Sequence, residues 1–185
     1  MEMDLIVSGF GGQGVLLTGV ALAYSAVIED KNTTWIPAYG GEMRGGTANC
    51  SVIISENEIA SPYIENPLNV IALNTPSMLK FENRIKPNGN LIVNSSIVDQ
   101  KPSRKDTNYI FIPVTDIAQK LGEPRCANMV ALGALVEKTK VVKLENIVTA
   151  LSKIFPPSKA NLIALNRSAL ESGAEFVKHL NLVKC

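Results

Sequence analysis

The sequence has few of the residues that hold metals and redox groups. It contains three cysteines and a single histidine in 185 residues. Cys50, Cys126 and Cys185 lie far apart and form no CxxC pair, which excludes the usual spacings of zinc sites, thioredoxin-like motifs and bacterial ferredoxin clusters. The histidine, His179, falls in the last predicted helix, so no obvious general base is present. We therefore expect neither a metal site nor a catalytic residue in this chain.

Aromatic residues and net charge are also scarce. Aromatics make up 5% of the chain and the formal net charge is +1, so neither a base-stacking platform nor an electrostatic footprint for nucleic acid is present. With 46% hydrophobic and 19% charged residues, the composition is slightly apolar for a soluble monomer and compatible with burial inside a complex. The length fits one domain over residues 1–185. The start Met-Glu-Met-Asp lacks the basic region of a signal peptide, which predicts the cytoplasm.

Charge is absent altogether from Leu5 to Ile28. That length would suffice for a membrane span. Glycines between residues 9 and 14 interrupt it, however, and the apolar parts on either side are short. A buried strand followed by a buried helix explains the run better, so no membrane contact is predicted.

The hydrophobic pattern predicts strands that alternate with helices, and then a last third that is all helix. This order indicates an α/β, three-layer Rossmann-like domain with a mostly parallel or mixed sheet and a helical C-terminal third. Two local predictions are a hairpin turn at Glu56-Asn57 into a strand from Glu58 to Ala60, and a helix cap at Thr115. The predicted strands are 4–8, 33–36, 50–55, 69–73, 91–94 and 109–114, and the predicted helices are 15–28, 76–84, 116–121, 127–137, 144–154 and 159–179.

The loop Gly9-Phe-Gly-Gly-Gln-Gly14 carries a GxGxxG pattern between a strand and a helix. Missing side chains let the backbone turn tightly and present helix N-terminal amides to an anion. The alternative is a tight turn without a ligand. NAD binding requires an acid at the end of the second strand, and that strand ends Trp35-Ile36-Pro37. The loop also lacks the Lys-Ser/Thr ending of a P-loop. The candidate ligand-binding residues here are Gly11, Gly12, Gln13 and Gly14.

A second glycine-rich loop runs from Ala38 to Gly46 and places Glu42 and Arg44 among glycines. Its polar side chains sit on a backbone that can take unusual angles. The alternative is a surface turn with a weak Glu42–Arg44 ion pair. Asn128 opens an otherwise apolar helix, where it either makes a helix-start hydrogen bond or contacts a ligand.

Three motifs together resemble the gamma subunits of 2-oxoacid:ferredoxin oxidoreductases, most of all the 2-oxoglutarate type. They are GFGGQGV, then YGGEMRGGTANCSVIIS followed by Ser61-Pro62, then RCANMVALGAL from Arg125 to Leu135. The resemblance runs from about Asp4 to the C-terminal helices. One departure is Gly41, where the family often has proline.

The resemblance implies a division of labour between subunits. These enzymes oxidatively decarboxylate a 2-oxoacid on thiamine diphosphate, transfer the acyl group to coenzyme A and pass electrons to ferredoxin through iron–sulfur clusters. Thiamine diphosphate, Mg and the clusters are expected on alpha, beta and ferredoxin-like delta partners. This chain, which has no Gly-Asp-Gly signature for a magnesium-bound diphosphate, is expected to contribute structure and coenzyme A contacts through Glu42, Arg44, Asn128 and the glycine loop. Alone it should be inactive and should self-associate, for example as a homodimer. A free-standing dinucleotide-binding protein and a non-catalytic assembly module are the alternatives.

Overall fold

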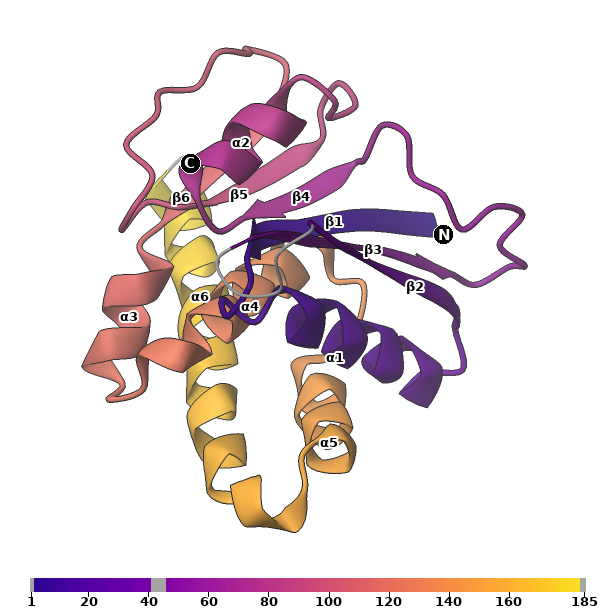
Figure 1. Cartoon of the computed structure of the whole chain (residues 1–185), viewed down its shortest axis with the longest axis vertical. Coiled ribbons are helices and arrows are strands. Elements are labelled where there is room, and N and C mark those ends of the chain that lie inside the picture. The colour runs from indigo at the N-terminus through magenta and orange to yellow at the C-terminus, as the bar shows by residue number, and fades with distance from the viewer. Residues whose placement is uncertain (1, 41–45, 184–185) are drawn as a thin grey trace.

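A single mixed sheet organises the computed structural model, which describes residues 2–40 and 46–183. In this part of the chain the strand order is β2-β3-β1-β4-β5-β6 (Figure 1). The strands are β1 (Glu2–Phe10), β2 (Asn32–Tyr39), β3 (Thr47–Ser55), β4 (Asn69–Ala72), β5 (Asn90–Asn94) and β6 (Asn108–Ile112). The helices are α1 (Val15–Ile28), α2 (Thr75–Glu82), α3 (Val114–Lys120), α4 (Ala127–Thr139), α5 (Leu144–Ile154) and α6 (Asn161–Val183), with short 3-10 helices at Pro124–Cys126 and Pro157–Lys159.

The sheet is parallel on one side of β1 and antiparallel on the other. β1, β4, β5 and β6 run parallel, whereas β3 is antiparallel to both β1 and β2. β2 therefore runs in the same direction as β1, and the carboxyl ends of all strands except β3 meet at one edge. Ligand sites of open α/β sheets favour that edge.

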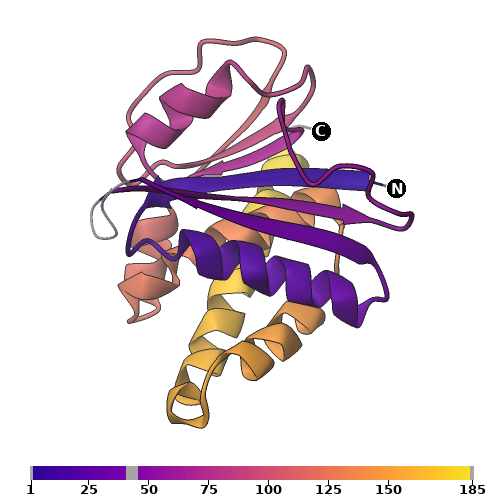
Figure 2. The same cartoon turned by 45° about the vertical axis from the view of Figure 1, so that its right-hand side comes forward.

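Helices cover both faces of the sheet, in the three layers that the sequence predicted (Figure 2). Successive side chains of β1 point to opposite faces: Leu5 and Val7 belong to the larger core with α1, α4, α5 and α6, and Ile6 belongs to the smaller core under α2. Residues 3–9 of β1 are all buried. This burial on both faces explains why the middle of the strand, Leu5 to Val7, is apolar at successive positions instead of alternating.

Two glycines let α4 and α6 cross with their backbones nearly in contact. A Cβ atom at Gly133 would lie 2.0 Å from the Leu170 carbonyl oxygen, and one at Gly173 would lie 1.9 Å from the Val130 carbonyl oxygen. Real Cβ atoms do not come so close to backbone oxygens, so these positions require glycine. The crossing anchors the C-terminal helix on α4.

Two local predictions are wrong, each for a structural reason. Residues Glu58–Ala60 form no strand, because β3 is already paired on both sides, by β1 and β2, and has no free edge for a hairpin partner. Thr115 is not a cap: α3 begins at Val114 after Pro113, and the Thr115 hydroxyl accepts a hydrogen bond from Asn94 Nδ2.

The uncharged run from Leu5 to Ile28 divides into most of β1, the glycine loop and α1. None of the helices in residues 2–40 and 46–183 is long and apolar enough to cross a membrane.

Candidate functional site

The glycine loop turns from β1 into α1 through two left-handed residues. Gly12 has φ +101° and Gly14 has φ +75°, a region that side chains other than glycine rarely adopt. Gly14 is the N-terminal cap of α1. Its carbonyl oxygen accepts hydrogen bonds from the Thr18 amide and hydroxyl, both at 3.0 Å. The pattern of glycines therefore follows from the backbone geometry of this turn.

Gln13 uses its side chain to hold the loop in place. Its Oε1 accepts from the Phe10 amide at 2.7 Å and from Asn74 Nδ2 at 3.1 Å, and its Nε2 donates to the Leu73 carbonyl at 3.4 Å. Asn74 is itself fixed, because its Oδ1 caps α2 by accepting from the Ser77 amide. The loop is thus tied to the ends of both β1 and β4, and the Gln13 amide is engaged by the protein.

Asn128 links the glycine loop to the C-terminal helices. Its Nδ2 donates to the Gly14 carbonyl at 3.2 Å and to the Thr18 hydroxyl at 3.1 Å. The side chain is 2% exposed. The prediction that Asn128 makes a helix-start hydrogen bond is wrong. Cys126 stands at the cap position of α4, and the Asn128 side chain bonds to Gly14 and Thr18 at the start of α1. Its contact with a ligand stays a prediction.

A cleft of about 240 Å³, lined by both polar and apolar side chains, opens at the carboxyl ends of β1, β4 and β5. One wall is the glycine loop, and the other comes from the start of α3 and the approach to α4. Asn94 crosses its floor, with Nδ2 bonded to the Thr115 hydroxyl at 3.0 Å and to the Leu73 carbonyl at 3.4 Å. The lining residues are Gly12, Gln13, Leu73, Asn94, Thr115, Pro124, Arg125, Ala127 and Asn128.

Arg125 is the cationic residue at the rim of this cleft, and its side chain is 79% exposed. Its guanidinium forms a fork with Glu123, with Nε–Oε1 at 2.8 Å and Nη2–Oε2 at 2.6 Å. These hydrogen bonds lower the pKa of Glu123 to about 2. Sequence reasoning used Arg125 only as part of a motif and Thr115 only as a predicted helix cap, and it did not single out Asn94. Because these residues come from three separate segments, only the fold brings them together.

The second glycine-rich loop meets the first at its described ends. The Gly11 amide donates to the Gly46 carbonyl at 2.9 Å, and the Gly40 amide donates to the Thr47 carbonyl at 2.7 Å. Both candidate side chains of that loop, Glu42 and Arg44, lie outside the described residues. The Gly11–Gly46 hydrogen bond joins the two loops at the carboxyl end of β1.

The acid that binds the NAD ribose would stand at the end of a different strand from the one that the sequence suggested. β2 lies at the edge of the sheet beside β3, so it is not the strand that would hold a ribose next to β1. The parallel neighbour of β1 is β4, and the chain continues from it as Leu73-Asn74. Neither of these two residues is an acid.

Cys50 is a core residue beside α1. It is 0% exposed, and its thiol contacts the Val15 carbonyl at 3.4 Å. Burial raises the pKa of the Cys50 thiol to about 12, which leaves it almost entirely protonated at neutral pH. A nucleophilic role is therefore excluded by its environment.

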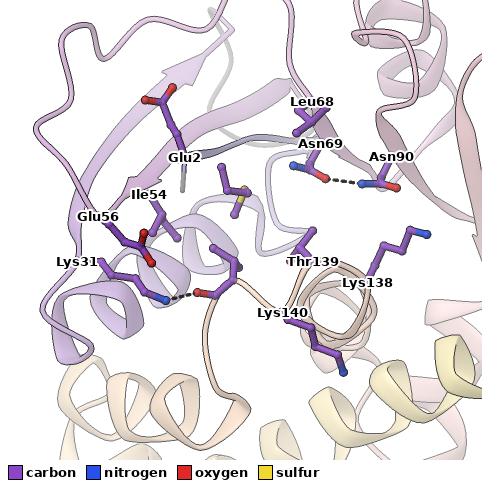
Figure 3. Close-up of a pocket in the computed structure, with 12 residues that line it drawn as sticks. Glu2, Lys31, Ile54, Glu56, Leu68, Asn69, Asn90, Lys138, Thr139 and Lys140 are labelled. Atoms are coloured by element: carbon purple, nitrogen blue, oxygen red, sulfur yellow. Dashed lines mark hydrogen bonds between the residues drawn. The ribbon is translucent and has the colours of Figure 1, made fainter.

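A larger cavity of about 350 Å³ lies at the opposite edge of the sheet, near the amino ends of β1, β4 and β5 (Figure 3). Three lysines surround it, but two of them have local partners. Lys31 Nζ bonds to Glu29 at 2.8 Å and to the Val141 carbonyl at 2.5 Å, and Lys140 pairs with Glu137. The third, Lys138, lies in the last turn of α4, where a cation compensates the helix dipole. We therefore place the candidate site in the smaller cleft, which has the glycine loop and the favoured edge of the sheet.

Comparison with known proteins agrees with this geometry. The sequence profile of the family described as pyruvate ferredoxin/flavodoxin oxidoreductase matches residues 4–176. The chain belongs to this family.

Two relatives show how this oxidoreductase-family chain corresponds to whole subunits and to parts of longer ones. It is 33% identical to the 2-oxoglutarate synthase subunit KorC of Methanocaldococcus jannaschii over 185 residues, 97% of this chain and 96% of that protein. It is 35% identical to the ketoisovalerate oxidoreductase subunit VorA of Methanothermobacter thermautotrophicus over 177 residues, 96% of this chain but only 37% of that protein. The chain thus spans about a third of the length of VorA.

Solved structures give the same correspondence for this family member. The gamma subunit of a keto/oxoacid ferredoxin oxidoreductase from Geobacter sulfurreducens superimposes with a TM-score of 0.80 at 31% identity, covering 96% of this chain and 99% of that one. A 2-oxoglutarate:ferredoxin oxidoreductase from Magnetococcus marinus, solved with 2-oxoglutarate, coenzyme A and succinyl-CoA, matches with a TM-score of 0.87 at 23% identity, covering 96% of this chain and 31% of that one. The predicted fold and the predicted resemblance to gamma subunits are confirmed.

Proposed function

We propose that this chain acts as the gamma-type subunit, a single domain over residues 1–185, of a cytoplasmic 2-oxoacid:acceptor oxidoreductase. The reaction converts a 2-oxoacid and coenzyme A to acyl-CoA and CO₂, with two electrons passed to ferredoxin or a similar acceptor. 2-Oxoglutarate is the proposed substrate, because KorC matches this chain over nearly its whole length. The observation that carries the proposal is the cleft between the glycine loop and Arg125 at the carboxyl edge of the sheet.

Thiamine diphosphate, Mg and the iron–sulfur clusters belong, in this proposal, to alpha, beta and ferredoxin-like delta partners. Within residues 2–40 and 46–183, no three His, Cys, Asp or Glu side chains are grouped to hold a metal ion. Cys50 and Cys126, the two cysteines in those ranges, are both buried. The described residues therefore do not fit a cluster or a magnesium-bound diphosphate, and we derive no step through these groups.

Coenzyme A is the substrate that the cleft suits. Gly12 is exposed and carries no side chain, so a ligand can approach its backbone closely. Thr115 and Asn128 add polar groups of the kind that bind amides. At the rim, the fork with Glu123 uses the Nε–Nη2 edge of Arg125, so the Nη1 edge remains for a phosphate oxygen. Arg44 is proposed as a second phosphate contact, and Glu42 as the residue that orients it.

The test is the kinetics of the assembled enzyme with Arg125→Ala and Arg44→Ala. Each should raise the KM for coenzyme A and leave the KM for the 2-oxoacid nearly unchanged, because the phosphate contact is equal in ground and transition states. An exposed charge-assisted contact predicts a rise of roughly three- to tenfold. Arg167→Ala on α6, whose side chain is 47% exposed, is the matched control and should change neither constant. Unchanged coenzyme A kinetics in intact complexes would reject a coenzyme role for both arginines.

Two further measurements test the wider proposal. The pure chain, given 2-oxoglutarate, coenzyme A and a dye acceptor, should show no turnover, since the oxidation requires groups held by the partners. Mass spectrometry of the acyl-CoA product formed by the native complex identifies the 2-oxoacid. Succinyl-CoA is expected, and a branched acyl-CoA would reject 2-oxoglutarate as the substrate.

A further inference from the structure

The first helix is apolar on the side that faces away from the core. No residue of α1, from Val15 to Ile28, carries a charge. Its outer face, defined here as Val20, Tyr24 and Val27, follows the i, i+4, i+7 spacing of one helix side. Tyr24 is 48% exposed and Val27 is 56% exposed. A helix that is apolar all round is typical of one that is buried on every side.

The other long surface helices of this chain do present charge to solvent. On α5 the exposed residues include Glu145 and Lys153, and on α6 they include Arg167, Glu171 and Glu175. Helices of this protein therefore have polar outer sides where they face water. The outer face of α1 departs from that pattern, as a helix face that another polypeptide covers would.

The edge strand next to α1 is poorly suited to take up a further strand. The Gly40 amide bonds to Thr47 of β3, so alternate residues back along β2, Ala38 and Ile36 among them, also face β3. Pro37 then points its backbone outward, where it has no N–H to donate. Proline at such a position blocks strand addition. A partner on this side of the molecule should therefore contact side chains, those of α1 first.

The position of α1 links its outer face to the candidate site. The helix starts directly after Gly14, the last residue of the glycine loop, and runs along the β2–β3 side of the sheet (Figure 2). Leu17, one turn from the loop, is half-buried, and Val20 follows it. A polypeptide seated on α1 therefore extends to the glycine loop without leaving the surface.

We propose that the outer face of α1 docks the partner subunit that corresponds to the part of VorA beyond the region this chain matches. The inference rests on the proposed function. In VorA the matched region is 37% of the polypeptide, so a domain of this kind is joined there to additional protein, and packing between the two parts belongs to this proposal. That packing would cover apolar surface which this chain leaves exposed.

The size of the face favours this occupant over a second copy of the chain. Fourteen residues give a helix about 20 Å long and about 10 Å wide, or roughly 200 Å² of projected face. A stable interface buries about 800 Å² on each partner. A symmetric dimer on α1 alone falls well short of that value. A larger partner that covers α1 and also reaches the edge of the cleft can bury an area of that size.

The test is assembly of the full-length chain, co-expressed with the thiamine- and cluster-binding subunits of the enzyme. Tyr24→Lys and Val27→Lys, singly and together, place charge on the face while keeping a good helix former, so the melting temperature should not fall. Leu79→Lys on α2, where the leucine is 52% exposed on the other side of the sheet, is the matched control. We expect the double variant to weaken the complex at least about tenfold in native mass spectrometry on dilution, and the control to change it less than about twofold.

The outcomes separate this inference from the function on which it rests. If the wild-type chain does not assemble with those subunits, the proposed function itself is rejected. If wild type and lysine variants assemble equally well, the function stands and docking through α1 is overturned. Docking is also overturned if the variants lose only self-association of the isolated chain, because a second copy is then the occupant.

Discussion

Replacement of Gly14 by alanine should destabilise the protein by two effects that separate variants can measure. Gly14 has φ +75°, and alanine in the left-handed region costs about 1–2 kcal/mol. The new Cβ would also lie 2.5 Å from Asn128 Nδ2. The Asn128 side chain must move, which breaks its bonds to the Gly14 carbonyl and the Thr18 hydroxyl. Two such bonds contribute about 1–3 kcal/mol.

The expected total is about 2–5 kcal/mol, or a fall in melting temperature of roughly 4–20 °C for a chain of this size. Urea unfolding followed by the fluorescence of Trp35, the single tryptophan, measures it. Gly122→Ala is the matched control, because Gly122 has φ +85° and a Cβ there meets nothing within 4 Å. Gly122→Ala should lower the free energy of unfolding only by the cost of alanine in the left-handed region, about 1–2 kcal/mol.

Asn128→Ala alone should cost about 1–3 kcal/mol. Since Gly14→Ala already breaks the same bonds, the double variant should fall short of the sum by about that amount. Equal losses for Gly14→Ala and Gly122→Ala, together with additive effects of Gly14→Ala and Asn128→Ala, would refute the conclusion that Asn128 holds the glycine loop.

Three further predictions follow from other parts of the fold. Gly173→Ala places a Cβ 1.9 Å from the Val130 carbonyl and should destabilise the chain by roughly 1–3 kcal/mol by forcing α4 and α6 apart, whereas an unchanged melting temperature would contradict the close crossing. Burial raises the pKa of the Glu82 carboxyl, but hydrogen bonds from the Ser103 backbone and the Tyr109 hydroxyl outweigh it, so the pKa lies below 4.5. The ionised Glu82 carboxylate therefore stabilises the fold above pH 4.5, and this stabilisation is lost as the pH falls through the folded-state pKa. The urea midpoint should fall more steeply between pH 7 and pH 3 in wild type than in Glu82→Gln. Equal pH dependence of the two midpoints would contradict a stabilising role of the carboxylate. Because burial raises the pKa of the Cys50 thiol to about 12, iodoacetamide at pH 8 should label it only after unfolding, and rapid labelling of the native protein would show that it is accessible.

Local sequence patterns were sufficient to predict most of the helices and strands. The apolar residues Leu5 to Val7 in β1 and the glycines that follow predicted a strand, a tight turn and a helix, and α1 has the predicted bounds, Val15–Ile28. These signals are local because a glycine at positive φ or a period of side chains depends on few neighbours. The same reasoning failed at Glu58–Ala60, where strand propensity had no partner to pair with, because β1 and β2 already occupy both edges of β3.

The candidate site depended on tertiary structure to a greater degree. The sequence alone identified the two glycine loops, and it singled out Gln13 as a member of the first loop and Asn128 as a polar residue in an apolar helix. Only the fold decided that Asn128 bonds to Gly14, 114 residues away, and that Asn94, Thr115 and Arg125 share a cleft with the glycine loop. Strand order controls these meetings, and it is set by the burial of both sheet faces at once, a property of the whole chain that no local pattern contains.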